Sequence, residues 1–169
     1  MKSLIVLAMH GAPPNDFPRE KAGEFFRLHA RFGLNPGSKD DPTFARYLEL
    51  ESEMVKWPRT PINDPFRAGA VELADELKKS SGLDVIVGFN EFCAPSLDET
   101  LDEAASLSPE KVIVVTPMLT KGGEHAARDI PEAIKRAQSR HPGIPFVYAW
   151  PFETEEVGRF LAEQINRFL

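Results

Sequence analysis

The sequence predicts a three-layer α/β fold, in which helices cover both faces of a four-stranded parallel sheet. Short, almost wholly apolar segments at 4–9, 83–89, 111–117 and 145–150 are typical of strands that are buried on both faces. Segments with helical spacing of apolar residues separate these strands. Strands that alternate with helices favour right-handed crossovers and therefore a parallel sheet.

The first connection between strands, residues 11–82, is unusually long and rich in proline. We expect helices at 18–32 and 43–56, and a third that begins at Asp64-Pro65 and ends at Gly82. Aspartate is a favourable N-cap, proline fits the first helical position, and glycine often ends a helix. The whole connection, 11–82, fits an embedded lid and an elaborated connection equally well, and the role of its Pro-rich part, 13–65, stays open.

Each later strand is followed by a predicted helix, at 96–107, 129–140 and 154–168. The D-x-x-E pattern from Asp129 to Glu132 resembles a capping box, so we expect Asp129 to be an N-cap. The last helix has an apolar face made by Val157, Leu161, Ile165 and Phe168. We expect one domain over 1–169, with the helical insertion at about 11–82.

Composition excludes several classes of function. The net charge of −6 argues against a nucleic-acid partner, because phosphate contacts need a basic surface. No apolar run approaches the ~20 residues of a membrane-spanning helix. Cys93 is the single cysteine, which excludes an internal disulfide and fits a reducing, cytoplasmic location. We expect Cys93 to be a small buried residue.

Open parallel α/β sheets bind ligands beyond the carboxyl ends of their strands. His10 follows the first predicted strand, Glu91 follows the second, and His125 lies beyond the third. Trp150 and Phe152 follow the fourth. We therefore expect two imidazoles and a carboxylate at one edge of the sheet, beside an aromatic pair that offers an apolar wall.

Two histidines and a carboxylate suit a divalent ion such as Fe²⁺, Co²⁺, Ni²⁺ or Zn²⁺, with positions left open for a substrate atom. The same groups could instead act as bases, because imidazole titrates near neutrality. Taken singly, His10 could satisfy backbone groups, and Glu91 and His125 could be exposed loop residues. Gly122 and Gly123 suggest a backbone shaped for close approach. The joint placement of the three side chains favours a functional site.

Three segments resemble the sirohydrochlorin cobaltochelatase (CbiX-type) family, which is related to the ferrochelatases. "VVTPMLTKGGEHAARDIPEAI" resembles the family's signature, in which H-x-x-x-D-I-P closes the motif. "VLAMHGAP" is similar to its strand–H-G start, and "NEFCAPSLDETL" to its Glu-containing segment. The resemblance covers roughly 3–11 and 83–168.

The resemblance implies a chelatase fold with strand order 2-1-3-4, which places the strands of His10 and His125 side by side. It implies a lyase-class metal chelatase that inserts Co²⁺ or Fe²⁺ into sirohydrochlorin, toward cobalamin or siroheme. His10 and His125 are then the metal-binding and proton-accepting pair, and Glu91 is the assisting carboxylate. The metal is a substrate, no organic cofactor is expected, and short members of the family commonly form homodimers.

Two alternatives remain open at this point. The protein could be a tetrapyrrole or metal carrier, since binding and insertion would use the same residues. It could also be a histidine-type phosphatase with His10 as nucleophile. Such enzymes need an arginine directly before the histidine to hold phosphate, and Met9 occupies that place.

Overall fold

The computed structural model describes residues 2–33, 37–38 and 40–169, which fall into two compact units. The sheet unit comprises Met1–His10, Leu73–Asn90 and Pro95–Leu169. The helical unit comprises Gly11–Glu72 and Glu91–Ala94. The chain thus leaves the sheet unit directly after His10 and again directly after Asn90. The expectation of a single domain over 1–169 stays a prediction.

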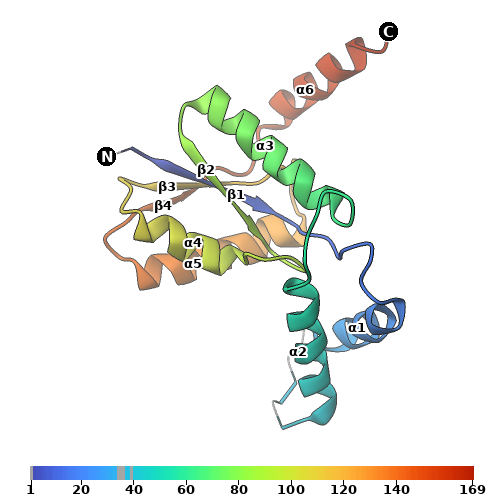
Figure 1. Ribbon diagram of the computed structural model, residues 1–169. Coiled ribbons are helices and arrows are strands. Elements are labelled where there is room, and N and C mark those ends of the chain that lie inside the picture. Colours follow the sequence, from blue (N-terminus) through green and yellow to red (C-terminus); the bar gives the residue numbers. More distant parts are fainter. Residues whose placement is uncertain (1, 34–36, 39) are drawn as a thin grey trace. The chain divides into compact units, whose positions relative to one another are not determined.

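The sheet unit contains four parallel strands in the order β2-β1-β3-β4, as predicted (Figure 1). They are β1 (Leu4–Met9), β2 (Asp84–Phe89), β3 (Val112–Val115) and β4 (Phe146–Tyr148). The central strand β1 pairs with β2 on one side and with β3 on the other. His10 therefore follows a strand that is directly next to β3, the strand that precedes His125.

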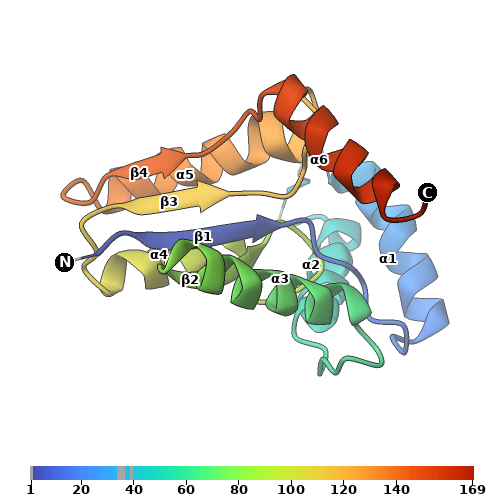
Figure 2. The ribbon, with the colours of Figure 1, turned by 90° about the horizontal axis from the view of Figure 1, so that it is seen from above.

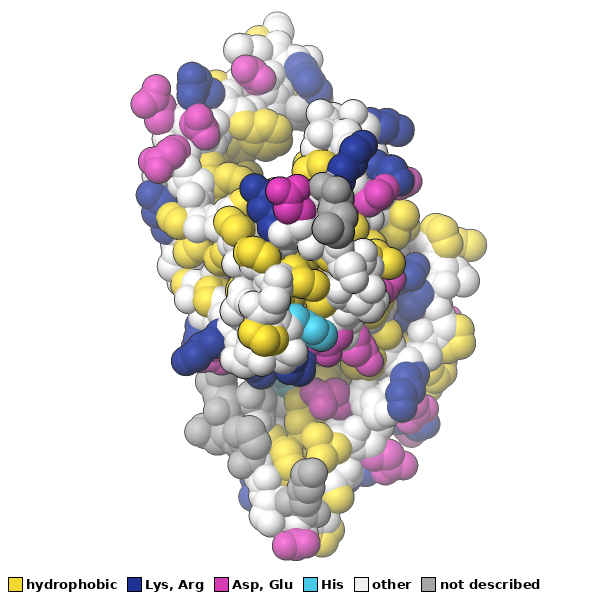
Figure 3. Space-filling view, turned by 90° about the vertical axis from the view of Figure 1, so that its left-hand side faces the viewer, with side chains coloured by type: hydrophobic (Ala, Val, Ile, Leu, Met, Phe, Trp, Pro, Cys, Tyr) yellow, Lys and Arg dark blue, Asp and Glu magenta, His cyan; other side chains and the backbone are white. Residues whose placement is uncertain are grey.

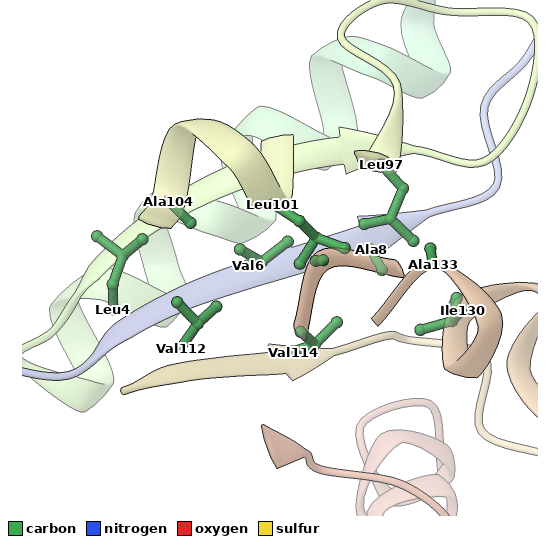
Figure 4. Close-up of a cluster of buried hydrophobic side chains, with 11 residues drawn as sticks. Leu4, Val6, Ala8, Leu97, Leu101, Ala104, Val112, Val114, Ile130 and Ala133 are labelled. Carbon is green, nitrogen blue, oxygen red and sulfur yellow. The ribbon is translucent and has the colours of Figure 1, made fainter. Parts of the chain in front are cut away.

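One face of the sheet is covered by α4 (Leu97–Ser106) and α5 (Ile130–Arg140) (Figure 4). Alternate residues of β1 point to this face, because successive side chains of a strand alternate between faces. Small side chains where the helices meet the sheet allow a close approach. The buried cluster consists of Leu4, Val6, Ala8, Leu97, Leu101, Ala104, Val112, Val114, Ile130, Ala133 and Ala137.

Residues 73–81 of α3 (Pro65–Ser81) lie above the opposite face of the sheet in the view of Figure 1. Ile5, Leu7 and Met9 of β1 are buried on this face. The outer part of the same face is more open, since Val147 in the middle of β4 is 47% exposed. Helices thus lie on both faces, but the second face is covered unevenly.

The last helix, α6 (Thr154–Asn166), extends away from the sheet in both Figure 1 and Figure 2. It forms where the sequence predicts it, but its apolar face is not packed on the sheet. Phe160, Leu161 and Ile165 are 60%, 50% and 59% exposed. Its start lies beside an apolar pocket of about 260 Å³ that is lined by Leu119, Phe152, Val157 and Phe160.

The helical unit is built from α1 (Arg19–Phe32), α2 (Pro42–Val55) and the first part of α3. Its core is mostly aromatic and includes Phe17, Phe25 and Phe32. The predicted cap at Asp64 is also confirmed, because its carboxylate accepts a hydrogen bond from the backbone N–H of Arg67. The other core residues are Phe44, Tyr47, Leu50 and Met54.

Three further expectations concern the surface and the lone cysteine. Among the described helices, none combines the length and the apolar character needed to cross a membrane. A nucleic-acid partner would need a basic surface, but lysine and arginine side chains are interspersed with acidic side chains in the view of Figure 3. Cys93 is buried, as predicted, and this burial raises the pKa of its thiol.

Candidate metal centre

The first candidate ligand, His10, directly follows β1. The preceding residue, Met9, accepts two hydrogen bonds at its carbonyl oxygen, one from the backbone N–H of Asn90 at 2.9 Å and one from Asn90 Nδ2 at 3.1 Å. These bonds tie the end of β1 to the end of β2. Gly11 has a φ of 98°, a conformation that favours glycine, so the chain can turn directly after His10.

The second candidate ligand, His125, begins a five-residue π-helical turn that extends to Asp129 and leads into α5. The N–H of Ile130 bonds to the carbonyl of His125 in this wider turn. Pro131 has no N–H to offer the Ala127 carbonyl and would crowd it in a regular α-helix, which explains the wider turn here. Such turns occur frequently at functional sites.

The two imidazoles lie against each other, as the strand order predicts. Their ring centroids are 4.4 Å apart and the ring planes are nearly perpendicular, at 86°. Each ring offers a nitrogen within 4.8 Å of a nitrogen on the other. Both residues belong to the sheet unit and both are half-buried. The geometry therefore brings two histidines, 115 positions apart in the chain, to one place.

The expectation that Asp129 caps a helix is wrong. Asp129 has helical φ and ψ values of −68° and −43°, and its side chain caps no backbone N–H. Its Oδ2 lies 2.7 Å from Nδ1 of His125, and its Oδ1 accepts a hydrogen bond from Nε of Arg128. The helix begins at His125 rather than at Asp129, so Asp129 lies one turn later on the same helical face.

Asp129 sets the chemistry of the His125 ring. A carboxylate only accepts hydrogen bonds, so Nδ1 carries the hydrogen and Nε2 carries the lone pair. A carboxylate behind a metal-binding histidine fixes the orientation of the ring and increases its basicity. Sequence reasoning missed this residue, although the i, i+4 spacing from His125 to Asp129 was visible as the signal.

Two aromatic side chains near the end of β4 hold the turn that carries His125. The hydroxyl of Tyr148 donates to the carbonyl of Ala126 at 2.9 Å, and burial raises the pKa of Tyr148 to about 12. Nε1 of Trp150 donates to the carbonyl of Met118 at 3.1 Å. The two residues of the predicted aromatic pair, Trp150 and Phe152, therefore have different contacts. Trp150 braces the loop before His125, while Phe152 lines the apolar pocket beside α6.

The glycines before His125 make no close approach to the described part of the protein, and an approach to another molecule stays a prediction. A Cβ atom added at Gly122 or Gly123 would meet no described atom within 4 Å. Gly122 has a φ of 87°, which L side chains rarely adopt. The loop therefore needs glycine at position 122 for its backbone conformation.

The third candidate, Glu91, is the first residue of the segment 91–94, which belongs to the helical unit. Its carbonyl accepts a hydrogen bond from the N–H of Cys93, and the intervening Phe92 has a φ of 60°. Glu91 follows Asn90 as His10 follows Met9, and Asn90 and Met9 are hydrogen-bonded to each other. The role of Glu91 as a ligand stays a prediction.

The other two histidines, His29 and His141, have partners of their own. His29 packs among the aromatic side chains of the helical unit, with its ring stacked on Phe25. His141 caps the end of α5, and its Nε2 lies 2.8 Å from the carboxylate of Asp102. His10 and His125 are therefore the histidines that the structure brings together.

Comparison with known proteins finds a family model and relatives that match the chain. The CbiX family model matches residues 63–167, a range that includes Glu91 and His125 and begins after His10. Sirohydrochlorin cobaltochelatases from two archaea are similar in sequence. The protein from Sulfurisphaera tokodaii is 33% identical over 101 residues, which are 59% of this chain and 79% of the relative. The protein from Saccharolobus islandicus is 31% identical over 103 residues, which are 57% and 79% of the two chains.

A solved structure supports the fold. The crystal structure of a CbiX protein assigned to cobalamin (vitamin B12) biosynthesis, from Marinobacter aquaeolei VT8, matches with a TM-score of 0.54 and 18% identity. The match covers 98% of this chain and 95% of that protein. Since the family model matches well over half of the residues, the chain belongs to the CbiX family.

Proposed function

We propose that this protein is a lyase-class metal chelatase that inserts Co²⁺ or Fe²⁺ into sirohydrochlorin, a step toward cobalamin or siroheme. The observation that carries the proposal is the contact between the His10 and His125 rings at the carboxyl edge of the sheet. The similar proteins that are named sirohydrochlorin cobaltochelatases support the substrate. The metal ion is consumed as a substrate, and the proposal needs no organic cofactor.

Insertion of a divalent ion releases two protons from the pyrrole nitrogens of the macrocycle. Nε2 of His125 is suited to hold the incoming ion, because Asp129 keeps the hydrogen on Nδ1. Two imidazoles leave coordination positions open, so the ion can pass to the macrocycle. Once the ion has moved, a neutral imidazole can accept a released proton. We assign these two tasks to His10 and His125.

We assign Glu91 to the same site as a third, carboxylate ligand. The support is its place in the chain, one residue beyond the hydrogen bonds that join Met9 to Asn90. A negative ligand would also lower the net charge of the bound ion and help its desolvation. We propose a cytoplasmic location, since the lone Cys93 is a buried thiol and fits a reducing compartment.

We further propose that the protein is a homodimer that uses the apolar face of α6. Phe160, Leu161 and Ile165 are at least half exposed, and Val147 leaves part of the sheet open as well. Exposed apolar patches of this kind mark interaction surfaces. The acidic first turn of α6 and Arg167 at its end would pair with each other across an antiparallel contact between two copies.

The dimer is tested by light scattering coupled to size-exclusion chromatography. We expect the wild type to run as a dimer and the double variant Phe160→Ser/Ile165→Ser as a monomer. Leu107→Ser is the control, because Leu107 is also 60% exposed but lies outside α6. A wild type that is monomeric, or a double variant that stays dimeric, would contradict this interface.

The activity is tested by following the absorbance of sirohydrochlorin with Co²⁺ or Fe²⁺ and catalytic amounts of protein. We expect metallation faster than the spontaneous rate, and a loss of ~100-fold or more in His125→Ala, as for removal of a general base. His141→Ala is the control, because its ring pairs with Asp102 instead. Tight binding of sirohydrochlorin with an unchanged metallation rate would indicate a carrier and overturn the proposal.

A further inference from the structure

Arg59 is a buried arginine in the loop between α2 and α3, within the Pro-rich region whose role the sequence leaves open. Its side chain is 7% exposed, and that of its ion-pair partner Asp64 is 1% exposed. Buried charges are rare unless they are paired and hydrogen-bonded. The contacts of this guanidinium therefore indicate what the position does.

The guanidinium bonds to three backbone carbonyls and one carboxylate, all within the helical unit. Nη1 donates to Ala12 O at 2.7 Å and to Asp64 Oδ2 at 2.5 Å. Nη2 donates to Met54 O at 2.9 Å and to Phe92 O. The fork of a guanidinium can reach several acceptors in fixed directions, which an ammonium group cannot do as well.

Two of these carbonyls belong to the segments that carry candidate ligands. Ala12 lies two residues after His10, and Phe92 directly follows Glu91. Phe92 has a φ of 60°, a conformation that is unfavourable for a bulky residue and that needs support from its surroundings. The hydrogen bond from Arg59 fixes the carbonyl of this residue.

The position also keeps an unfavourable feature. Nε of Arg59 is buried and has no hydrogen-bond acceptor among the described residues. A buried donor without an acceptor destabilises the folded state, because it has lost its hydrogen bonds to water. Such local costs occur where a residue has a functional task beyond packing.

We propose that Arg59 is a positioning residue for the metal centre. It holds the chain after His10 and the chain after Glu91 on one rigid group, and so fixes the direction in which the Glu91 carboxylate is presented. This inference rests on the proposed function, in which Glu91 is a ligand. It gives the inserted helical region a task, since Arg59 and Asp64 both come from that region.

Asp64 holds the Arg59 side chain in place. Its Oδ2 neutralises Arg59, while its Oδ1 accepts the N–H of Arg67 at the start of α3. Arg59 is therefore linked, through Asp64, to the N-terminus of α3. Rigid support of this kind limits the positional freedom of a ligand and raises metal affinity.

The test is a double-mutant cycle on Co²⁺ affinity, with Arg59→Lys and Glu91→Gln. Co²⁺ is titrated into the apoprotein and followed by its absorbance. We expect Arg59→Lys to weaken Co²⁺ binding ~10–100-fold, the range for loss of a group that supports a metal ligand. In the Glu91→Gln background, the same substitution is expected to have almost no further effect, because both act through one carboxylate. Arg46→Lys is the control, because Arg46 is a partly exposed arginine of the same unit.

Three results would overturn the inference. They are wild-type affinity in Arg59→Lys, equal losses from Arg59→Lys in both backgrounds, and a Glu91→Gln variant that binds Co²⁺ as the wild type does. The last result would leave the proposed chelatase standing if His125→Ala still abolished metallation. Failure of the wild type to metallate sirohydrochlorin would instead remove the proposed function itself.

A second measurement needs no variant and so does not depend on correct folding of Arg59→Lys. Hydrogen exchange is compared in the wild-type protein with and without Co²⁺. If Arg59 couples the two segments to the metal, Co²⁺ is expected to slow exchange at both 11–16 and 91–94. Slowing confined to residues near His125 would overturn the inference.

Discussion

The two segments that carry His125 and Glu91 are held in different ways. The turn of His125 is supported within the sheet unit, by Asp129 four residues later and by Tyr148 from β4. The segment of Glu91 belongs to the helical unit, and its Phe92 carbonyl is held by Arg59, 33 positions earlier in the sequence. The segment of a candidate ligand can thus be held by a local helical contact or by a buried charge that is distant in the sequence.

This difference predicts how substitutions near each segment affect stability and chemistry. The support of His125 is partly exposed, since the side chains of His125 and Asp129 are 21% and 30% accessible. The support of Glu91 is almost fully buried, since Arg59 and Asp64 are 7% and 1% accessible. We therefore expect changes near His125 to alter chemistry with little effect on folding, and changes near Arg59 to alter both.

The largest effect is expected from Asp64→Asn, which breaks the buried support. The substitution keeps the size of the side chain but leaves the Arg59 guanidinium buried without a counter-charge. Removing one partner of a buried ion pair costs about 3–5 kcal/mol. We expect the free energy of unfolding, measured by urea denaturation, to fall by an amount in that range.

Asp98→Asn is the matched control for this prediction, because it removes a carboxylate from ion pairs that are exposed. Asp98 pairs with Arg136 and Arg140 across α4 and α5, with 38% of its side chain accessible. Exposed pairs contribute about 0–1 kcal/mol. Equal losses of unfolding free energy in Asp64→Asn and Asp98→Asn would contradict the expected difference between the buried ion pair and the exposed ion pairs.

The difference between local contacts and contacts that are distant in the sequence explains what could be predicted from the sequence. The strands and the edge at which His10 and His125 meet follow from apolar runs and strand–helix alternation along the chain, and the order of the strands follows from the family resemblance. Arg59 could not be recognised, because its partners Ala12 and Phe92 lie 47 and 33 positions away. Only folding shows that they share one guanidinium.

Asp129 is the intermediate case, because a correct local signal was interpreted wrongly. The D-x-x-E pattern is typical of an N-cap, but the π-helical turn begins the helix four residues earlier. The exposed face of α6 could not be predicted either. Apolar periodicity predicts an amphipathic helix but does not reveal whether its partner is in the same chain.

The second prediction concerns the contact between Asp129 and His125. Asp129→Asn keeps a side chain of the same shape beside His125 but removes the negative charge that lies 2.7 Å from Nδ1 of its ring. We expect Co²⁺ affinity to fall ~10–100-fold, with little change in the free energy of unfolding. A Co²⁺ titration of the apoprotein measures the first quantity and urea denaturation the second.

Glu124→Gln is the matched control for Asp129→Asn, because Glu124 also pairs with Arg128 and its side chain is 54% exposed. It is expected to bind Co²⁺ as the wild type does. If Asp129→Asn retained full affinity, the carboxylate behind His125 would have no part in metal binding.

The smallest effect concerns the pH dependence of the exposed ion pairs in the sheet unit. The hydrogen bond from Arg136 is the main reason that the pKa of Asp98 is lowered from its ordinary value, with Arg140 assisting and partial burial opposing. A lowered folded-state pKa means that the pairs stabilise the protein above the unfolded-state pKa of ~3.9. That contribution is lost as the pH falls through the lower, folded-state pKa.

We therefore expect the free energy of unfolding of the wild type to fall more steeply than that of Asp98→Asn as the pH is lowered from about 5 to about 3, since the variant has no carboxyl to protonate at this position. Above pH 5 the two proteins are expected to differ by less than about 1 kcal/mol. Urea denaturation across this pH range measures both. Parallel curves would show that Asp98 is solvated rather than paired, and the contrast with Asp64 would then rest on burial alone.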